Sequence, residues 1–186
     1  MIAGIVIAVI VVLLLLIFAA SYNALIRARN RIDSAFSQID VQLKRRHDLI
    51  PNLVETVKGY AAHERGTLDS VTQARAAAVT AGQAGSPQAQ AEAENTLTTT
   101  LRSLFAVAEQ YPDLKANQNF LSLQEELTAT EDRIAYARQF YNDQVLSYNN
   151  GIATFPRAVI ARMFNFQKRE YFDAAPEDEA PVHVQF

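Results

Sequence analysis

The sequence runs IAGIVIAVIVVLLLLIFAA from Ile2 to Ala20, without one charged or strongly polar side chain. A helix of this length is about what is needed to cross the hydrocarbon core of a bilayer. We therefore predict a single N-terminal transmembrane anchor over residues 1–21. Two alternatives are weaker: a cleaved signal peptide has a shorter apolar run after basic residues, and a buried core helix would need more surrounding chain than is available.

The charges around this apolar segment predict its orientation. No Lys or Arg precedes it, whereas Arg27, Arg29 and Arg31 follow closely. Basic residues beside a span favour the cytoplasmic side. We therefore expect a single-pass protein of the plasma membrane with its N-terminus outside and its domain in the cytoplasm. An extracytoplasmic domain is the alternative.

The amino-acid composition favours helix and excludes several kinds of functional site. The 186 residues include no Cys, no Trp, six Gly and six Pro, with abundant Ala, Leu, Glu, Gln and Arg. Without Cys, disulfides, thiolate metal sites and a Cys nucleophile are excluded. A net charge of -3 gives no reason to expect a nucleic acid partner.

Beyond the anchor, apolar residues recur every three or four positions, as on one face of a helix. They are Ile32, Phe36, Ile39, Leu43, Ile50, Val54, Val57, Ala61, Leu68 and Val71. We predict one long amphipathic helix that reaches about Ala78. Because a proline removes a backbone hydrogen bond, we expect a kink or short break from His47 to Pro51.

Turn signals divide the remaining chain into three more helices. Ser86 suits an N-cap and Pro87 the first position of a second helix, which should end at residues 111–113 because of the proline there. A third helix is expected over residues 116–150 and a short fourth one after Pro156. The predicted fold is all-α: the transmembrane helix continues into an elongated helical domain over residues 22–173.

An acidic linker and an extended C-terminal tail are predicted over residues 174–186. The last six residues alternate apolar and polar side chains, with Val182, Val184 and Phe186 on one side. A frayed terminus is one interpretation. The other is an extended peptide that docks on a neighbouring subunit or sheet edge, since no other strand is predicted within the chain.

The sequence contains no pattern typical of an enzyme. No Glu is followed by a His three residues on, as a dimetal site in a helical bundle requires, and no phosphate-binding glycine loop is present. His47 and His63 are interpreted as surface or helix-flank residues. We predict no catalytic residues, no metal site and no cofactor.

The densest positive cluster is Lys44, Arg45, Arg46 and His47. A solvated helix face is one interpretation; anionic lipid or an acidic protein surface is the other. Lys44 would stand about 35 Å beyond the span, which disfavours lipid. Candidate acidic partners are the pairs 125–126 and 131–132, within the bundle or between subunits.

Five asparagines fall on or beside the predicted helix faces. Asn is a poor helix former, so each is expected to have a hydrogen-bond partner, and such residues can set register or subunit number in a bundle. They are Asn23, Asn30, Asn52, Asn142 and Asn149.

Three blocks of sequence together resemble the LemA family. They read RNRIDSAFSQIDVQLKRRHDLIPNLVETVKGYAAHE over residues 29–64, YPDLKANQNF over 111–120 and ARQFYN over 137–142. The resemblance extends over nearly the whole chain. It implies a bacterial membrane-anchored antiparallel helical bundle, and it implies the fold rather than a biochemical role.

Two function classes follow. The first is a non-enzymatic scaffold that is fixed in the bilayer, has coiled-coil-like packing and self-associates into a homo-oligomer, with residues 175–186 linking neighbouring subunits. The alternative is a monomeric accessory or signalling component that binds another membrane protein.

Overall fold

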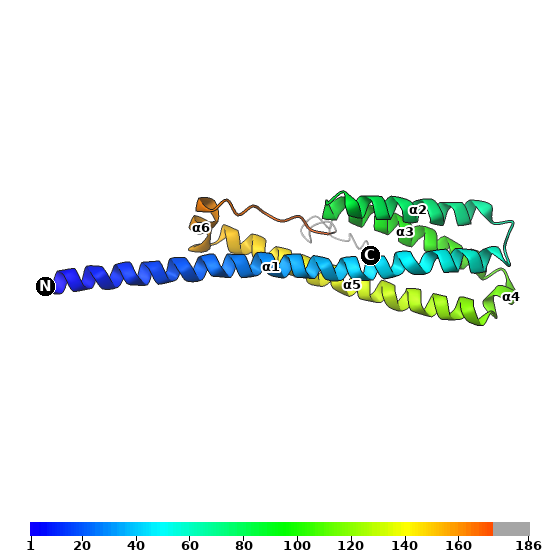
Figure 1. Ribbon diagram of the computed structural model, residues 1–186, viewed down its shortest axis with the longest axis horizontal. Coiled ribbons are helices and arrows are strands. Elements are labelled where there is room, and N and C mark those ends of the chain that lie inside the picture. Colours follow the sequence, from blue (N-terminus) through cyan, green and yellow to red (C-terminus); the bar gives the residue numbers. More distant parts are fainter. Residues whose placement is uncertain (173–186) are drawn as a thin grey trace, which may run out of the picture.

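The computed structural model describes residues 1–172, which form an elongated rod of six helices (Figure 1). No strand occurs in this range, and the all-α prediction is confirmed. The helices are α1 (Ile2–Lys58), α2 (Arg65–Gln83), α3 (Pro87–Ala108), α4 (Pro112–Lys115), α5 (Gln118–Ala153) and α6 (Arg157–Met163).

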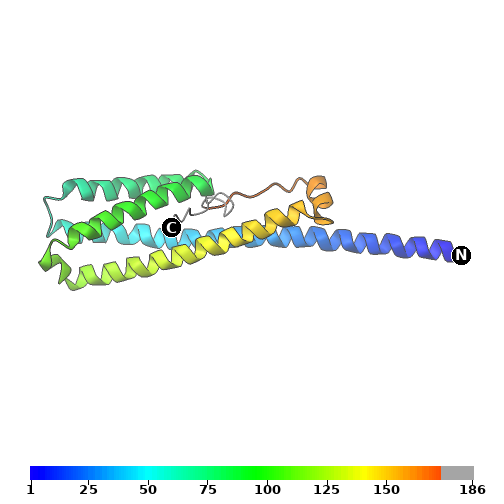
Figure 2. The same ribbon diagram turned by 180° about the vertical axis from the view of Figure 1, so that it is seen from behind.

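Helices α1 and α5 form a long antiparallel pair, and the α2–α3 hairpin covers its distal half (Figures 1 and 2). Near the membrane end, Ile32 and Ile39 of α1 pack in one buried cluster with Tyr141 and Val145 of α5. At the distal end a second cluster joins α1 and α5 to the α2–α3 hairpin. The burial of these apolar faces holds the rod together.

The prediction that the first long helix reaches Ala78 is wrong. Helix α1 ends at Lys58, and the chain turns over residues 59–64 before α2 begins. Leu68 and Val71 keep the helical spacing because they pack in the same distal cluster as Val57, but on a reversed helix. Hydrophobic periodicity indicates which face of a helix is buried, but it does not show that the chain reverses direction between two helices.

The expected break at His47 to Pro51 is also absent, because α1 continues through Pro51. The proline is exposed, while the flanking Ile50 and Leu53 are buried in the distal cluster. Packing on both sides of the proline therefore keeps the helix continuous.

Most other boundaries agree with the prediction. The Ser86 side chain caps α3 by accepting a bond from the Ala89 backbone N–H, and Pro87 is its first residue. Helix α5 begins later than expected, at Gln118, because the Asn117 side chain caps it through the backbone N–H of Phe120. The short helix α4 was not predicted.

The first part of α1 stands alone. Its apolar window is entirely unburied, and the helix projects beyond α6 at the end of the rod (Figure 1). Its first contact with the bundle is that of Phe18 with Phe164, and burial begins at Ser21 and Leu25. The single apolar segment among the described residues is therefore joined to the bundle by uninterrupted helix.

After α6 the chain reverses and runs back along the rod (Figure 2). Asn165 adopts a left-handed conformation with φ of 54°, and the Phe166 backbone N–H donates to the Ala161 carbonyl at 2.9 Å. This is the hydrogen-bond pattern of a Schellman helix end, in which Asn tolerates the left-handed position. The predicted tail with Val182, Val184 and Phe186 lies outside the described residues.

Candidate functional site

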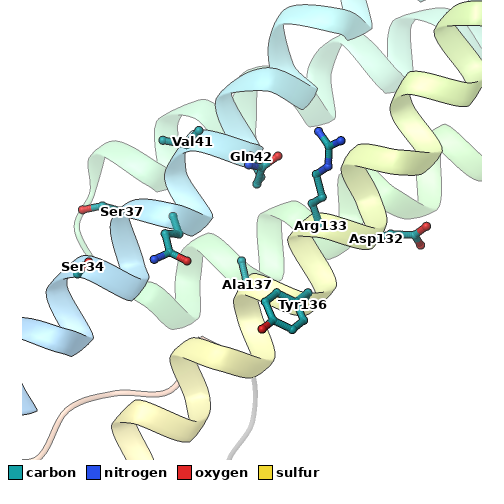
Figure 3. A pocket seen from close by; sticks show the side chains of 9 residues that line it. Ser34, Ser37, Val41, Gln42, Asp132, Arg133, Tyr136 and Ala137 are labelled. Carbon is teal, nitrogen blue, oxygen red and sulfur yellow. The ribbon is translucent and has the colours of Figure 1, made fainter.

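A surface groove follows the seam between α1 and α5 (Figure 3). It has a volume of about 600 Å³. Two large side chains stand on its sides, Val41 at 63% and Tyr136 at 72% exposure. The lining residues are Ser34, Ser37, Gln38, Val41, Gln42, Asp132, Arg133, Tyr136 and Ala137.

The residues that line this groove are more typical of a surface that binds another protein than of an active site. Small residues such as Ser34 and Ala137 leave space between the two helices, while Asp132 and Arg133 offer opposite charges. A mixed surface of this kind, with an exposed tyrosine, is typical of protein interfaces. Sequence reasoning missed the groove, although Ser34, Ser37 and Val41 share one helical face.

The basic run from Lys44 to His47 is not one surface. Lys44 is exposed, and Arg45 is half-exposed and pairs with Glu126 of α5 at 2.5 Å. The side chain of Arg46 is fully buried, so the prediction of a solvated face is wrong for this residue. Its periodic position places it on the core side of α1, where only paired charges are tolerated.

Arg46 is the centre of a buried charge cluster that joins three helices. Its guanidinium pairs with Glu94 of α3, whose side chain is also fully buried, and with Glu131 of α5 at 2.6 Å. It also donates to the Thr98 hydroxyl at 2.9 Å. The acidic partners of the basic run therefore lie within the bundle.

His47 completes this cluster, with its Nε2 atom 2.9 Å from the second oxygen of Glu94. Burial alone raises the pKa of the Glu94 carboxyl, but the hydrogen bond with His47 and the charge of Arg46 outweigh burial and lower that pKa below its ordinary value of 4.5. Glu94 is thus held as a carboxylate. Arg46 and Glu94 are fully buried, whereas the Glu131 side chain is 37% exposed, and together these ion pairs join α3 to α1 and α5.

A second polar arrangement holds the extended segment 166–172 against α5. We call Tyr141, Asn142, Tyr148 and Asn149 the clamp residues. The Asn149 side chain accepts from the Arg169 backbone N–H at 2.9 Å and donates to the Arg169 carbonyl at 3.0 Å. The Asn142 side chain accepts from the Phe172 backbone N–H at 2.9 Å.

The two tyrosines of the clamp also form hydrogen bonds with the backbone of the extended segment. Tyr148 donates to the Gln167 carbonyl at 3.0 Å, and Tyr141 donates to the Glu170 carbonyl at 2.9 Å. Burial raises the pKa of the Tyr141 hydroxyl to about 12, so it remains a donor at neutral pH. The two tyrosines are seven residues apart on α5, and so are the two asparagines. Together they form hydrogen bonds with the backbone of segment 166–172, as a neighbouring strand would in a sheet.

The five asparagines thus divide into two groups. Asn142 and Asn149 have their partners in the same chain, on the extended segment. Asn23, Asn30 and Asn52 lie on exposed surface of α1.

The histidines and acidic residues of the described part form no metal-binding group: within residues 1–172 no three of them gather as metal ligands would. His63 is exposed in the turn after α1, whereas His47 is mostly buried beside Glu94.

Comparisons with known proteins agree with the family resemblance of the sequence. A family model described as the LemA family matches residues 35–186. Magnetosome protein MamQ of Magnetospirillum gryphiswaldense is 26% identical over 184 residues, an alignment that covers 87% of this chain and 68% of that protein. Protein LemA of Metamycoplasma hominis is 28% identical over 174 residues, covering 89% of this chain and 75% of that protein.

Proposed function

The chain belongs to the LemA family, and we propose that it is a non-enzymatic scaffold that α1 anchors in the bacterial membrane and that self-associates into a homo-oligomer. The apolar segment of α1 and the named relatives support membrane association. The groove between α1 and α5 is the observation that carries the proposal of self-association.

The anchor favours contact between grooves of neighbouring copies. Because α1 is continuous from the apolar segment into the bundle, Val41 stands about 30 Å beyond Ala20 in every copy. Copies in one membrane are parallel and share this height. Restriction to a plane also removes part of the orientational cost of association.

The groove has what a second copy needs to recognise it. Tyr136 of one copy provides an exposed aromatic side chain, and the small residues Ser34 and Ala137 of the neighbouring copy leave room for it in the groove. Asp132 of one copy lies at the same height as Arg133 of the next, which allows complementary pairing. Tyrosine and arginine are the residue types that dominate interface energies.

The C-terminal tail is proposed to strengthen this assembly. Val182, Val184 and Phe186 would dock as an extended peptide on a neighbouring subunit. Deleting residues 175–186 should then reduce the size of the assembly.

We also propose that the bundle lies in the cytoplasm, as the basic residues after the span favour. A green fluorescent protein fused to the C-terminus should fluoresce, and an alkaline phosphatase fused there should be inactive. The reverse pattern would place the bundle outside.

The decisive experiment measures the mass of the full chain in native nanodiscs. We expect a homo-oligomer for the wild type and a smaller species for Val41→Glu and Tyr136→Arg, because both place a charge in the groove. Leu121→Glu is the matched control, since Leu121 is 41% exposed on α5 but outside the groove. It should assemble as the wild type does.

Other results would overturn the proposal. A monomeric wild type would exclude the scaffold and favour the accessory component that binds another membrane protein. An oligomer that both groove variants leave unchanged would remove the groove from the interface. Unchanged helical circular dichroism would show that the variants are folded.

A further inference from the structure

Helix α6 lies at the level where the apolar segment of α1 ends. The ring of Phe164 lies 5.9 Å from that of Phe18, which is within the apolar segment, and 4.8 Å from that of Tyr22. On its inner side, α6 buries Ile160 and Ala161 in a cluster with Leu25. The end of the rod therefore lies level with the end of the apolar segment of α1 (Figures 1 and 2).

The outer side of this end is apolar and uncovered among the described residues. Val159 and Met163, four apart on α6, are 52% and 66% exposed, while Phe155 before the helix is 86% and Phe164 after it 49% exposed. We call these four residues the tip. Exposed to water, such a patch is unfavourable, but it has the composition of a segment that lies in a membrane interface.

Beside the tip, three arginines line one pocket of about 240 Å³. Arg27 and Arg31 come from α1, and Arg157 is the first residue of α6. We call them the arginine pocket. Within residues 1–172 none of the three has a carboxylate partner, whereas Arg45 and Arg46 are both paired.

The height of the arginine pocket matches that of lipid head groups. Arg27 stands about 10 Å beyond the end of the apolar segment, and its side chain can reach back toward the interface. Guanidinium groups bind phosphate through paired hydrogen bonds, and three unneutralised ones in one pocket attract an anion strongly.

We propose that the tip and the arginine pocket form a second membrane contact, in which the tip enters the interface and the pocket binds the phosphate of a lipid head group. The anchor and this contact then meet the same leaflet at two points. That fixes the rod against tilt and rotation about the span. The proposal rests on the anchor and is independent of self-association.

The depth of the tip can be measured because the chain has no Cys. The full chain carrying Phe155→Cys or Val159→Cys is labelled with an environment-sensitive fluorophore and reconstituted in vesicles. We expect blue-shifted emission and quenching by spin-labelled lipids. Leu121→Cys, at the distal end of the rod, should show neither effect. Solvent-like emission at both tip positions would overturn the insertion.

The pocket is tested by native mass spectrometry of the protein released from nanodiscs of mixed phosphatidylglycerol and phosphatidylcholine. The wild type should retain phosphatidylglycerol, and the variant with Arg27→Gln, Arg31→Gln and Arg157→Gln should lose it. The matched control replaces three exposed basic residues far from the pocket, Lys44, Arg65 and Arg102, by Gln and should keep the lipid.

A second arm distinguishes lipid phosphate from free phosphate. Inorganic phosphate is titrated calorimetrically into wild-type protein in pure phosphatidylcholine nanodiscs. Saturable binding that the triple Arg variant abolishes, without any retained lipid, would assign the pocket to a soluble phosphate and overturn the lipid proposal. Equal lipid retention by the wild type and the triple Arg variant would also overturn it.

Discussion

Arg75 of α2 donates from its Nε atom to the backbone carbonyl oxygen of His47 at 2.7 Å. That carbonyl is the one whose intrahelical partner would be the N–H of residue 51, and Pro51 has none. A side chain from the next helix thus occupies the acceptor that the proline leaves free. The proline that predicted a break in α1 instead creates an attachment point for α2.

The first prediction concerns this coupling. Arg75→Met should lower the free energy of unfolding by about 1.5–3 kcal/mol, because it removes a hydrogen bond from a charged donor to a partly buried acceptor. In a Pro51→Ala background the residue 51 N–H can satisfy the carbonyl, so the same substitution should cost less. Denaturant unfolding of the wild type, the two single variants and the double variant in detergent measures the difference. Equal costs in the two backgrounds would contradict the coupling.

The second prediction concerns the buried charge cluster. Arg46→Met leaves the buried Glu94 carboxylate without the guanidinium that pairs with it and should cost about 3–5 kcal/mol of stability. Arg45→Met is the control, because its pair with Glu126 is about half-exposed, and it should cost about 1 kcal/mol or less. Thermal and denaturant unfolding provide the values. If the two substitutions cost the same, the cluster does not stabilise the bundle.

The third prediction concerns the stability of the fold at acidic pH. The pKa of Glu94 is lower in the folded state than its ordinary value of 4.5, so the carboxylate binds protons less readily in the folded chain. Its contribution to stability is therefore complete above pH 4.5 and is lost as the pH falls through the lower folded-state pKa. Melting temperatures of the wild type should fall as the pH drops through this window.

Glu94→Gln should flatten that pH dependence, since the amide does not titrate. Glu109→Gln serves as the comparison, because Glu109 forms an exposed pair with Lys115, and its curve should run parallel to that of the wild type. Parallel curves for all three proteins would show that Glu94 has no part in acid unfolding.

The fourth prediction concerns the clamp. Asn149→Ala removes both side-chain bonds to the backbone of Arg169, and a hydrogen bond contributes about 0.5–1.5 kcal/mol. Because two bonds are lost, together about 1–3 kcal/mol, hydrogen exchange of the Arg169 amide should accelerate roughly 5-fold to 150-fold. Asn150→Ala, at the exposed neighbouring position, should leave the rate unchanged. An unchanged rate in Asn149→Ala would mean that packing alone holds the segment.

The sequence by itself determined the features that depend on local chemistry. The apolar segment from Ile2 to Ala20, the cap at Ser86 and the short helix after Pro156 were all predicted, because membrane partition, capping and helical periodicity act over one helix or a few residues. The family resemblance added the antiparallel bundle.

Only the tertiary structure decided which polar residues are structural. Arg46 stands in a basic run that is interpreted from sequence as solvated, but the structure buries it. Its partner Glu131 belongs to an acidic pair that the sequence names as a candidate, whereas its buried partner Glu94 of α3 carries no such signal. Asn142 and Asn149 stand out in the sequence as polar residues on a helix face, yet their partners belong to an extended segment with no periodic signal.

The same holds for the turn after Lys58, the groove along α1 and α5, and the arginine pocket. Each depends on where a helix reverses or on which side chains meet from distant segments. The spacing of apolar residues specifies that one face of a helix is buried. The free energy gained by burying that face is nearly the same whichever helix covers it. The partner is chosen by packing and charge pairing in three dimensions.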